Sequence, residues 1–121
     1  MTEAGRTLQP ELLAARRIGS RHEFDLRVPA DLAVWPGHFP EFFVVPGVLQ
    51  VDWVLRFAGA KLGLAAAPSR IEGLKFKTPL RPQQRFTLHL EIVSAQLVTF
   101  QLSELAEVFS LGRLHFDGAL P

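Results

Sequence analysis

A single segment of this chain has the length and composition of a long helix. Pro46 and Gly47 open it, and the run VLQVDWVLRFAGAKLGL that follows ends near Gly63, with Pro68 just beyond. A closing glycine with a proline after it is a typical stop signal for a helix. Apolar residues lie on nearly all sides of this segment, so we expect the helix to be buried on most of its faces.

The segments on both sides of this helix have the pattern of strands. Over residues 12–29, apolar and charged residues alternate around a break at Gly19 and Ser20, which predicts two strands joined by a turn. Residues 30–47 are rich in proline and glycine, which predicts an irregular loop. Four further strands are expected after the helix, over residues 70–78, 84–94, 96–107 and 109–116.

One long helix cannot supply the repeated crossovers of a parallel sheet. The economical arrangement is a single antiparallel sheet curled around that helix, which is an α+β fold. Such a sheet leaves an exposed edge, and pairing of edges in a twofold dimer is a common way to cover it. We therefore expect a homodimer built from one domain, residues 1–121, with residues 1–10 as a loose lead-in.

Composition argues against several classes of function. The 121 residues carry 13 Lys and Arg against 12 Asp and Glu, and this near balance does not suit a nucleic-acid-binding protein. Cysteine is absent, which excludes thiolate catalysis and Cys-ligated zinc and agrees with a reducing, cytoplasmic location. From the hydropathy of the chain we expect neither a membrane-spanning helix nor a signal peptide.

Among the four histidines, His38 has the most unusual surroundings. It lies in the run Trp35-Pro36-Gly37-His38-Phe39-Pro40, where proline and glycine fix the backbone and Phe39, Phe42 and Phe43 can exclude water. Burial disfavours a charged imidazole, so His38 suits the role of a neutral base near pH 7. Its alternative role is a hydrogen bond that orders the loop. The other histidines fall in expected strands at ordinary surface or half-buried positions: His22, His89 and His115.

Two features of the expected helix could take part in chemistry. Asp52 stands in its second turn among apolar residues, where a carboxyl either pairs or has its pKa raised until it serves as a proton donor. Arg56, four residues on and on the same face, is the available partner. The N–H groups of Gly47 and Val48 lie at the positive end of the helix dipole, where they can polarise a carbonyl oxygen. A base, an acid and an oxyanion donor together suit removal of a proton next to a carbonyl and loss of a neighbouring hydroxyl.

The order and spacing of these residues carry a family resemblance. Gly37-His38-Phe39-Pro40, followed after five residues by Pro46-Gly47-Val48-Leu49 and then by Asp52, resembles the signature of the hotdog-fold 3-hydroxyacyl-[acyl-carrier-protein] dehydratases. The run Lys75-Phe76-Lys77-Thr78-Pro79-Leu80-Arg81-Pro82 is similar to the strand and turn after the helix in that family. Residues 48–53 look most similar to the dehydratases of aryl-polyene and other specialised polyketide or fatty-acid biosynthesis clusters.

The resemblance implies a hotdog fold with active sites at a dimer interface, where one subunit supplies His38 and the other supplies Asp52. His38 would take the C2 proton of a 3-hydroxyacyl thioester, and Asp52 would assist loss of the C3 hydroxyl as water. Gly47, with Val48, would hold the thioester carbonyl. The product would be a trans-2-enoyl thioester on the phosphopantetheine of an acyl carrier protein, and neither a metal nor an organic cofactor is implied.

Other residues are candidates for substrate and partner binding. Phe39, Phe42 and Trp53 are expected in the core and could also line an acyl tunnel. The densest group of cations could form either a solvated strand face or a docking surface for an acidic acyl carrier protein: Lys75, Lys77, Arg81 and Arg85.

Two other functions stay open at this point. A hotdog thioesterase would use Asp52 to activate water or to attack the thioester, but His38 would then have no obvious role. A catalytically inactive acyl-binding or partner subunit, which stabilises a second hotdog protein, would follow if Arg56 occupies Asp52. Many members of the resembled family have a glutamate in place of Asp52 and an amide in place of Arg56. Assembly beyond a dimer, with itself or with another hotdog subunit, also stays open.

Overall fold

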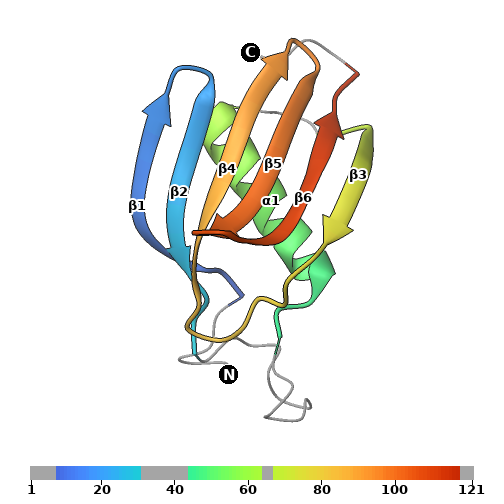
Figure 1. Ribbon diagram of the computed structural model, residues 1–121. Helices are drawn as coiled ribbons and strands as arrows, with labels where there is room; N and C mark the ends of the chain where they lie inside the picture. Colours follow the sequence, from blue (N-terminus) through green and yellow to red (C-terminus); the bar gives the residue numbers. More distant parts are fainter. Residues whose placement is uncertain (1–7, 31–43, 64–66, 118–121) are drawn as a thin grey trace, which may run out of the picture.

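The computed structural model describes residues 8–30, 44–63 and 67–117. Within them, six strands form one antiparallel sheet and one helix lies across one face of it (Figure 1). This is the α+β arrangement that the sequence pattern predicts. The elements are β1 (Glu11–Ile18), β2 (Arg21–Arg27), α1 (Gly47–Leu62), β3 (Arg70–Phe76), β4 (Arg85–Ser94), β5 (Leu97–Glu104) and β6 (Glu107–His115).

The strands lie in the order β1-β2-β4-β5-β6-β3, and every neighbouring pair is antiparallel. β3 follows the helix in sequence but pairs with β6, the last strand, so α1 carries the chain from one side of the sheet to the other (Figure 1). β1 and β3 are the two edges, where backbone N–H and C=O groups on one side have no neighbour in the sheet.

The turn between β1 and β2 and the end of α1 both lie at glycines, as the sequence predicts. Gly19, in the turn between β1 and β2, has a φ of 62°, and Gly63, directly after α1, has a φ of 68°. Both values are in the left-handed region, which glycine adopts without the steric cost that a Cβ brings.

The core lies between α1 and the sheet. Trp53 and Val54 of the helix are almost fully buried, and the indole of Trp53 stacks on the ring of Phe86 with centroids 6.0 Å apart. Every second residue of the central strands faces the helix, as expected for a sheet with one covered face. These buried residues are Phe24, Leu26, Phe86, Leu88, Leu90, Val98, Phe100, Leu102 and Leu114. Among the described residues we find no helix with the length and apolarity that crossing a bilayer requires.

The helix is less buried than its composition predicts. Val48 is 81% exposed and Arg56 and Lys61 also face outward, whereas the polar residue Gln50 is buried. The expectation of burial on most faces is therefore wrong for the single chain, because one sheet covers only one side of a helix. The uncovered side keeps an apolar residue, Val48, exposed at its N-terminal end.

The end of the N-terminal lead-in is fixed to the helix. Nε1 of Trp53 donates a hydrogen bond to the carbonyl oxygen of Leu8 at 2.6 Å, and Pro10 is buried. A buried indole N–H needs an acceptor, and Leu8 supplies it. This hydrogen bond ties Leu8 to α1, while the loose lead-in over residues 1–10 stays a prediction.

Candidate functional site

The first turn of α1 carries backbone N–H groups that find no acceptor within the helix itself. The N–H groups of Leu49 and Gln50 donate to the carbonyl oxygen of Pro46 at 3.0 and 3.1 Å. Gly47 and Val48 precede these two residues, so their N–H groups have no acceptor within the helix. They lie at the positive end of the helix dipole, and Pro46 has no side chain that could cap them. The role of these N–H groups as oxyanion donors stays a prediction.

The helix start is in direct contact with the edge strand β3. A Cβ at position 47 would lie 2.7 to 3.0 Å from three ring atoms of Phe76, the last residue of β3. Real Cβ atoms essentially never come this close to a neighbour, so a larger residue at position 47 would force the Phe76 ring to move. The Phe76 ring is itself 50% exposed, and with Val48 it forms an uncovered apolar surface at the entrance to α1.

Gln50 ties the loop before α1 to the helix. It is only 4% exposed, and its Nε2 donates a hydrogen bond to the carbonyl oxygen of Val45 at 3.2 Å. Its Oε1 is buried and has no hydrogen-bond partner among the described residues. The N–H of Val45 in turn donates to the carbonyl oxygen of Leu80 at 2.7 Å. Sequence reasoning missed this residue, because a polar residue in a helix gives no sign of the face on which it will lie.

Asp52 forms an ion pair with Arg56. Arg56 Nε donates to Asp52 Oδ2 at 2.8 Å, and the two side chains are 61% and 43% exposed. The expectation that apolar neighbours bury Asp52 is therefore wrong for the single chain, because Asp52 lies on the uncovered side of α1. An exposed pair at this spacing contributes about 0.3–0.5 kcal/mol, so a bound ligand can displace it at small cost.

Of the residues predicted for the loop and the acyl tunnel, the structure describes Trp53 alone. Trp53 is buried in the core as expected. His38, Phe39 and Phe42 lie outside the described residues. The meeting of His38 with Asp52 and the acyl tunnel therefore stay predictions.

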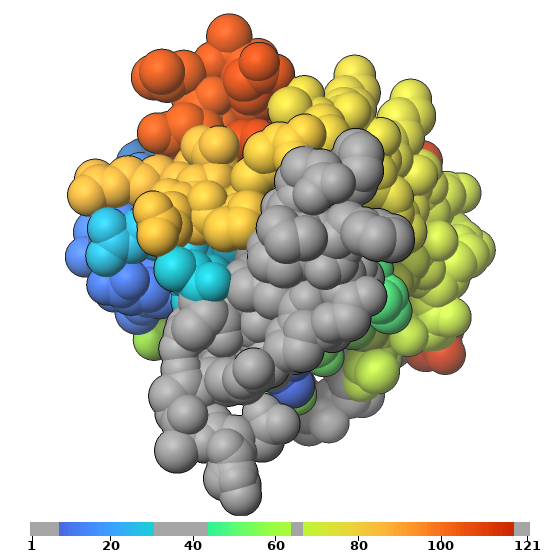
Figure 2. Space-filling model, turned by 90° about the horizontal axis from the view of Figure 1, so that it is seen from below, coloured from blue at the N-terminus to red at the C-terminus, as the bar shows by residue number. Residues whose placement is uncertain are grey.

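The four predicted docking cations are all exposed: Lys75, Lys77, Arg81 and Arg85. They follow the chain from β3 through the connecting loop to the start of β4, two strands that β5 and β6 separate in the sheet. Figure 2 views this end of the molecule from below, with the connection between β3 and β4 in yellow to gold. The cations are thus spread along one rim of the sheet. Their role in docking stays a prediction.

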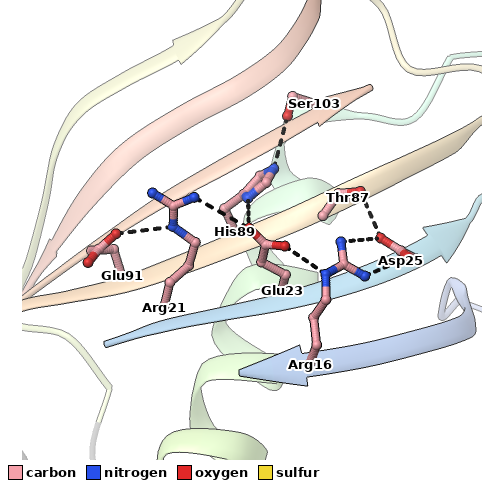
Figure 3. Close-up of polar contacts among 8 residues, drawn as sticks. All are labelled: Arg16, Arg21, Glu23, Asp25, Thr87, His89, Glu91 and Ser103. Atoms are coloured by element: carbon pink, nitrogen blue, oxygen red, sulfur yellow. Dashed lines mark hydrogen bonds and ion pairs between the residues drawn. The ribbon is translucent and has the colours of Figure 1, made fainter. Parts of the chain in front are cut away.

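A polar network, which we call the outer-face network, occupies the side of the sheet that points away from α1 (Figure 3). Glu23 accepts hydrogen bonds from Arg16 at 2.8 Å and Arg21 at 3.4 Å, and its Oε2 lies 3.2 Å from Nδ1 of His89. Nε2 of His89 lies 3.2 Å from Oγ of Ser103. The half-buried position expected for His89 is confirmed. The network thus links β1, β2, β4 and β5 by side chains.

Contacts within the outer-face network lower the pKa values of its carboxyl groups Glu23 and Asp25. Burial raises the pKa of Glu23, but the hydrogen bond from Arg16, the charge of His89 and the hydrogen bond from Arg21 outweigh it and leave the pKa below its usual value. The hydrogen bond from Arg16 also lowers the pKa of Asp25. Glu23 is therefore a stable carboxylate inside a cationic frame.

Ser103, His89 and Glu23 lie in a row that looks like a nucleophilic triad, but two features oppose that role. Ser103 is buried. The strand that carries it, β5, has hydrogen-bonded neighbours on both sides, β4 and β6, so the sheet uses the nearby backbone N–H groups that an oxyanion would need. We interpret the row as part of a stabilising network.

Solved structures with the same fold define the class of this protein. The chain superposes on a structure titled the dehydratase heterocomplex ApeI:P from Xenorhabdus doucetiae, with a TM-score of 0.78, 28% identity, and coverage of 88% of this chain and 96% of that chain. It also matches thioesterase superfamily member 2 from Mus musculus, with a TM-score of 0.62 at 12% identity over 88% and 79% of the two chains, which supports the fold alone. The fold is the hotdog fold.

A family model gives the narrower assignment. The model described as ApeI-like, ApeI dehydratase, matches residues 15–113, and the chain belongs to this family. This confirms the family that the motifs predict.

Curated relatives agree with that assignment. The 3-hydroxyacyl-[acyl-carrier-protein] dehydratase FabZ of Ruminiclostridium cellulolyticum is 36% identical over 80 residues, covering 58% of this chain and 54% of that protein. The FabZ of Novosphingobium aromaticivorans is 30% identical over 97 residues, covering 73% and 55%. The chain spans about half the length of these curated relatives.

Proposed function

We propose that this protein dehydrates 3-hydroxyacyl thioesters, bound to an acyl carrier protein, to trans-2-enoyl thioesters. The observation that carries the proposal is the start of α1. The N–H groups of Gly47 and Val48 find no acceptor among the described residues, and they lie within two helical turns of Asp52, which is on the uncovered side of the helix. Membership of a dehydratase family supports the same reaction.

In the proposed reaction the two helix N–H groups bind the thioester carbonyl oxygen and stabilise the negative charge that develops on it. His38 takes the C2 proton as general base, and the electron pair of that C–H bond becomes the new C2–C3 double bond. The bond from C3 to its hydroxyl breaks, and Asp52 donates the proton with which the hydroxyl leaves as water.

The proposed site is completed by a second subunit. β3 is the edge strand that contacts the helix start, through Phe76 and Gly47, whereas β1 lies at the opposite edge of the sheet. We therefore propose that β3 pairs with β3 of a second copy, which covers Val48 and Phe76 and lets the partner's loop bring its histidine to Asp52. The matched ApeI:P structure is described as a heterocomplex, so a second, different hotdog subunit is the alternative occupant of this edge.

One observation favours a second candidate function, that of an acyl-binding or partner subunit without activity. The ion pair with Arg56 occupies one carboxylate oxygen of Asp52, which is then not available to the substrate. Because both groups are exposed, we expect substrate to displace the pair, and dehydration remains the favoured function.

Mass spectrometry of thioester conversion tests the proposal. Purified protein is incubated with 3-hydroxyacyl and trans-2-enoyl thioesters, each bound to carrier protein or to coenzyme A. We expect a mass change of one water in both directions, lost in His38→Ala and in Asp52→Asn. Arg56→Gln serves as the matched variant, and we expect it to keep or increase activity because it frees the acid. Release of free acid without interconversion would indicate a thioesterase, and a folded oligomer with neither product would indicate the partner subunit.

A further inference from the structure

Gln50 has a buried side-chain amide of which one polar atom, Nε2, is hydrogen-bonded and the other, Oε1, is not. Nε2 donates to the carbonyl oxygen of Val45, whereas Oε1 has no partner in the part of the chain that the structure describes, and the residue is only 4% exposed. A buried acceptor without a partner lowers stability, and an apolar side chain of the same length would avoid this cost. Core packing alone therefore does not account for a glutamine at this position.

Two hydrogen bonds of Gln50, from its backbone N–H and from its side chain, lie at the entrance to α1. Its backbone N–H donates to the carbonyl oxygen of Pro46, and its side chain donates to the carbonyl oxygen of Val45. These two carbonyls belong to the two residues directly before Gly47. On the other side, the ring of Phe76 packs against Gly47 and blocks movement in that direction. The first peptide units of the helix are thus held from both sides.

We infer that Gln50 is a positioning residue for the proposed dehydration. By holding the Val45 carbonyl it fixes the direction in which Gly47 and Val48 present their N–H groups to the thioester oxygen. The inference rests on the proposed function, because a fixed direction matters only if an oxyanion binds there. Preorganised donors are effective because they need no rearrangement when charge develops.

The test replaces Gln50 by methionine, which has a similar length and no hydrogen-bonding amide. Ser110→Ala is the matched control, because Ser110 is the other described residue with a buried side-chain polar atom that has no partner. Three properties are measured on the full-length protein: thermal unfolding, ¹⁵N relaxation of the Gly47 and Val48 amides, and kcat and KM for a 3-hydroxyacyl thioester.

We expect Gln50→Met to unfold at or above the temperature of the wild type. Its kcat falls about tenfold or more while KM changes less than about threefold, since a misplaced donor costs rate more than binding. The order parameters of Gly47 and Val48 fall in Gln50→Met and stay unchanged in Ser110→Ala. A residue with a purely structural role would not lower kcat while leaving KM nearly unchanged.

Each contrary result has a separate meaning. Unchanged kcat and unchanged order parameters in folded Gln50→Met would overturn the inference while leaving the proposed function intact. A wild type that converts no thioester would defeat the proposed function, and the order parameters would then decide alone whether Gln50 fixes the helix start. If both Gln50→Met and Gln50→Leu fail to fold, Gln50 is a core residue and the inference is wrong.

Discussion

At the scale of single residues, the start of α1 depends on Gly47, which has no side chain. Gly47 leaves room for the ring of Phe76. Phe76 is the last residue of β3 and lies almost thirty residues further along the chain. Glycine there also leaves the helix N–H groups unobstructed. The same small residue therefore serves packing and the proposed chemistry.

Gly47→Ala tests the packing role. The new Cβ meets the Phe76 ring, and because that ring is half exposed and can partly move, we expect a loss of about 1 kcal/mol in the free energy of unfolding, at the low end for overpacking. In a Phe76→Leu background the clash disappears, and the higher helix propensity of alanine makes the same change neutral or stabilising. Urea unfolding of the four proteins measures the coupling. Equal losses in both backgrounds would contradict the ring contact.

At the scale of elements, the outer-face network joins the β1–β2 hairpin to the β4–β5 hairpin, which α1 and β3 separate in the chain. Arg16, Glu23, His89 and Ser103 come from β1, β2, β4 and β5, yet they form one continuous set of hydrogen bonds and ion pairs (Figure 3). Buried polar groups that are satisfied in this way favour one strand register over its alternatives.

Glu23→Gln tests this network. The folded protein lowers the pKa of Glu23, so its carboxylate stabilises the fold above the pKa of the unfolded chain, and this contribution is lost as pH falls through the lowered folded pKa. We expect the variant to lose about 1–3 kcal/mol of unfolding free energy at neutral pH. The difference from wild type should shrink in acid, as wild-type Glu23 becomes neutral. Urea unfolding across this pH range measures it, with Glu104→Gln in β5 as the control. A difference independent of pH would rule out the charged contacts as its source.

At the scale of the whole molecule, the two sheet edges differ in what lies beside them. Both carry exposed apolar residues, among them Leu12 on β1 and Leu74 on β3. Only β3 adjoins the helix start, through Phe76. An interface at β3 would therefore cover the proposed site, whereas an interface at β1 would leave it open.

Leu74→Lys and Leu12→Lys form a matched pair for this question, since the two leucines are 39% and 48% exposed. A charge on a paired edge opposes association. We expect Leu74→Lys to sediment as a monomer and to lose dehydration activity, while Leu12→Lys keeps the mass and activity of the wild type. Dissociation by the Leu12 variant alone would place the interface at β1 and would leave the proposed two-subunit site without support.

The rim cations make a separate prediction about the carrier protein. We expect the double variant Lys77→Glu and Arg81→Glu to raise KM about tenfold for a carrier-bound substrate and to leave KM for the coenzyme A thioester unchanged. Added salt should weaken the wild type's preference for the carrier, because surface charges are screened. Lys61→Glu, on an exposed residue in the last turn of α1, is the control. Equal effects on both substrates would argue against docking at this rim.

The local pattern of residue types was enough to predict where most helices and strands of the described chain lie. Alternation of apolar and charged residues located the strands, and the run after Pro46 located the described helix. Glycines marked the turn after β1 and the end of α1, but the turn between β5 and β6 lies at Leu105 and Ala106, inside the expected strand 96–107. The reason is physical: side-chain direction repeats every two residues in a strand, and breakers act on their own backbone. Motif spacing likewise pointed to the start of α1 and to the family.

Only the tertiary structure decided what each of those residues faces. Asp52, flanked by apolar residues, lies exposed beside Arg56, whereas Gln50, two residues earlier, is buried against Val45. Phe76 reaches Gly47 because β3 pairs with β6 at the edge next to the helix start. Burial and contact depend on which strand lies opposite, and that choice is made by long-range pairing, which no local stretch of sequence contains.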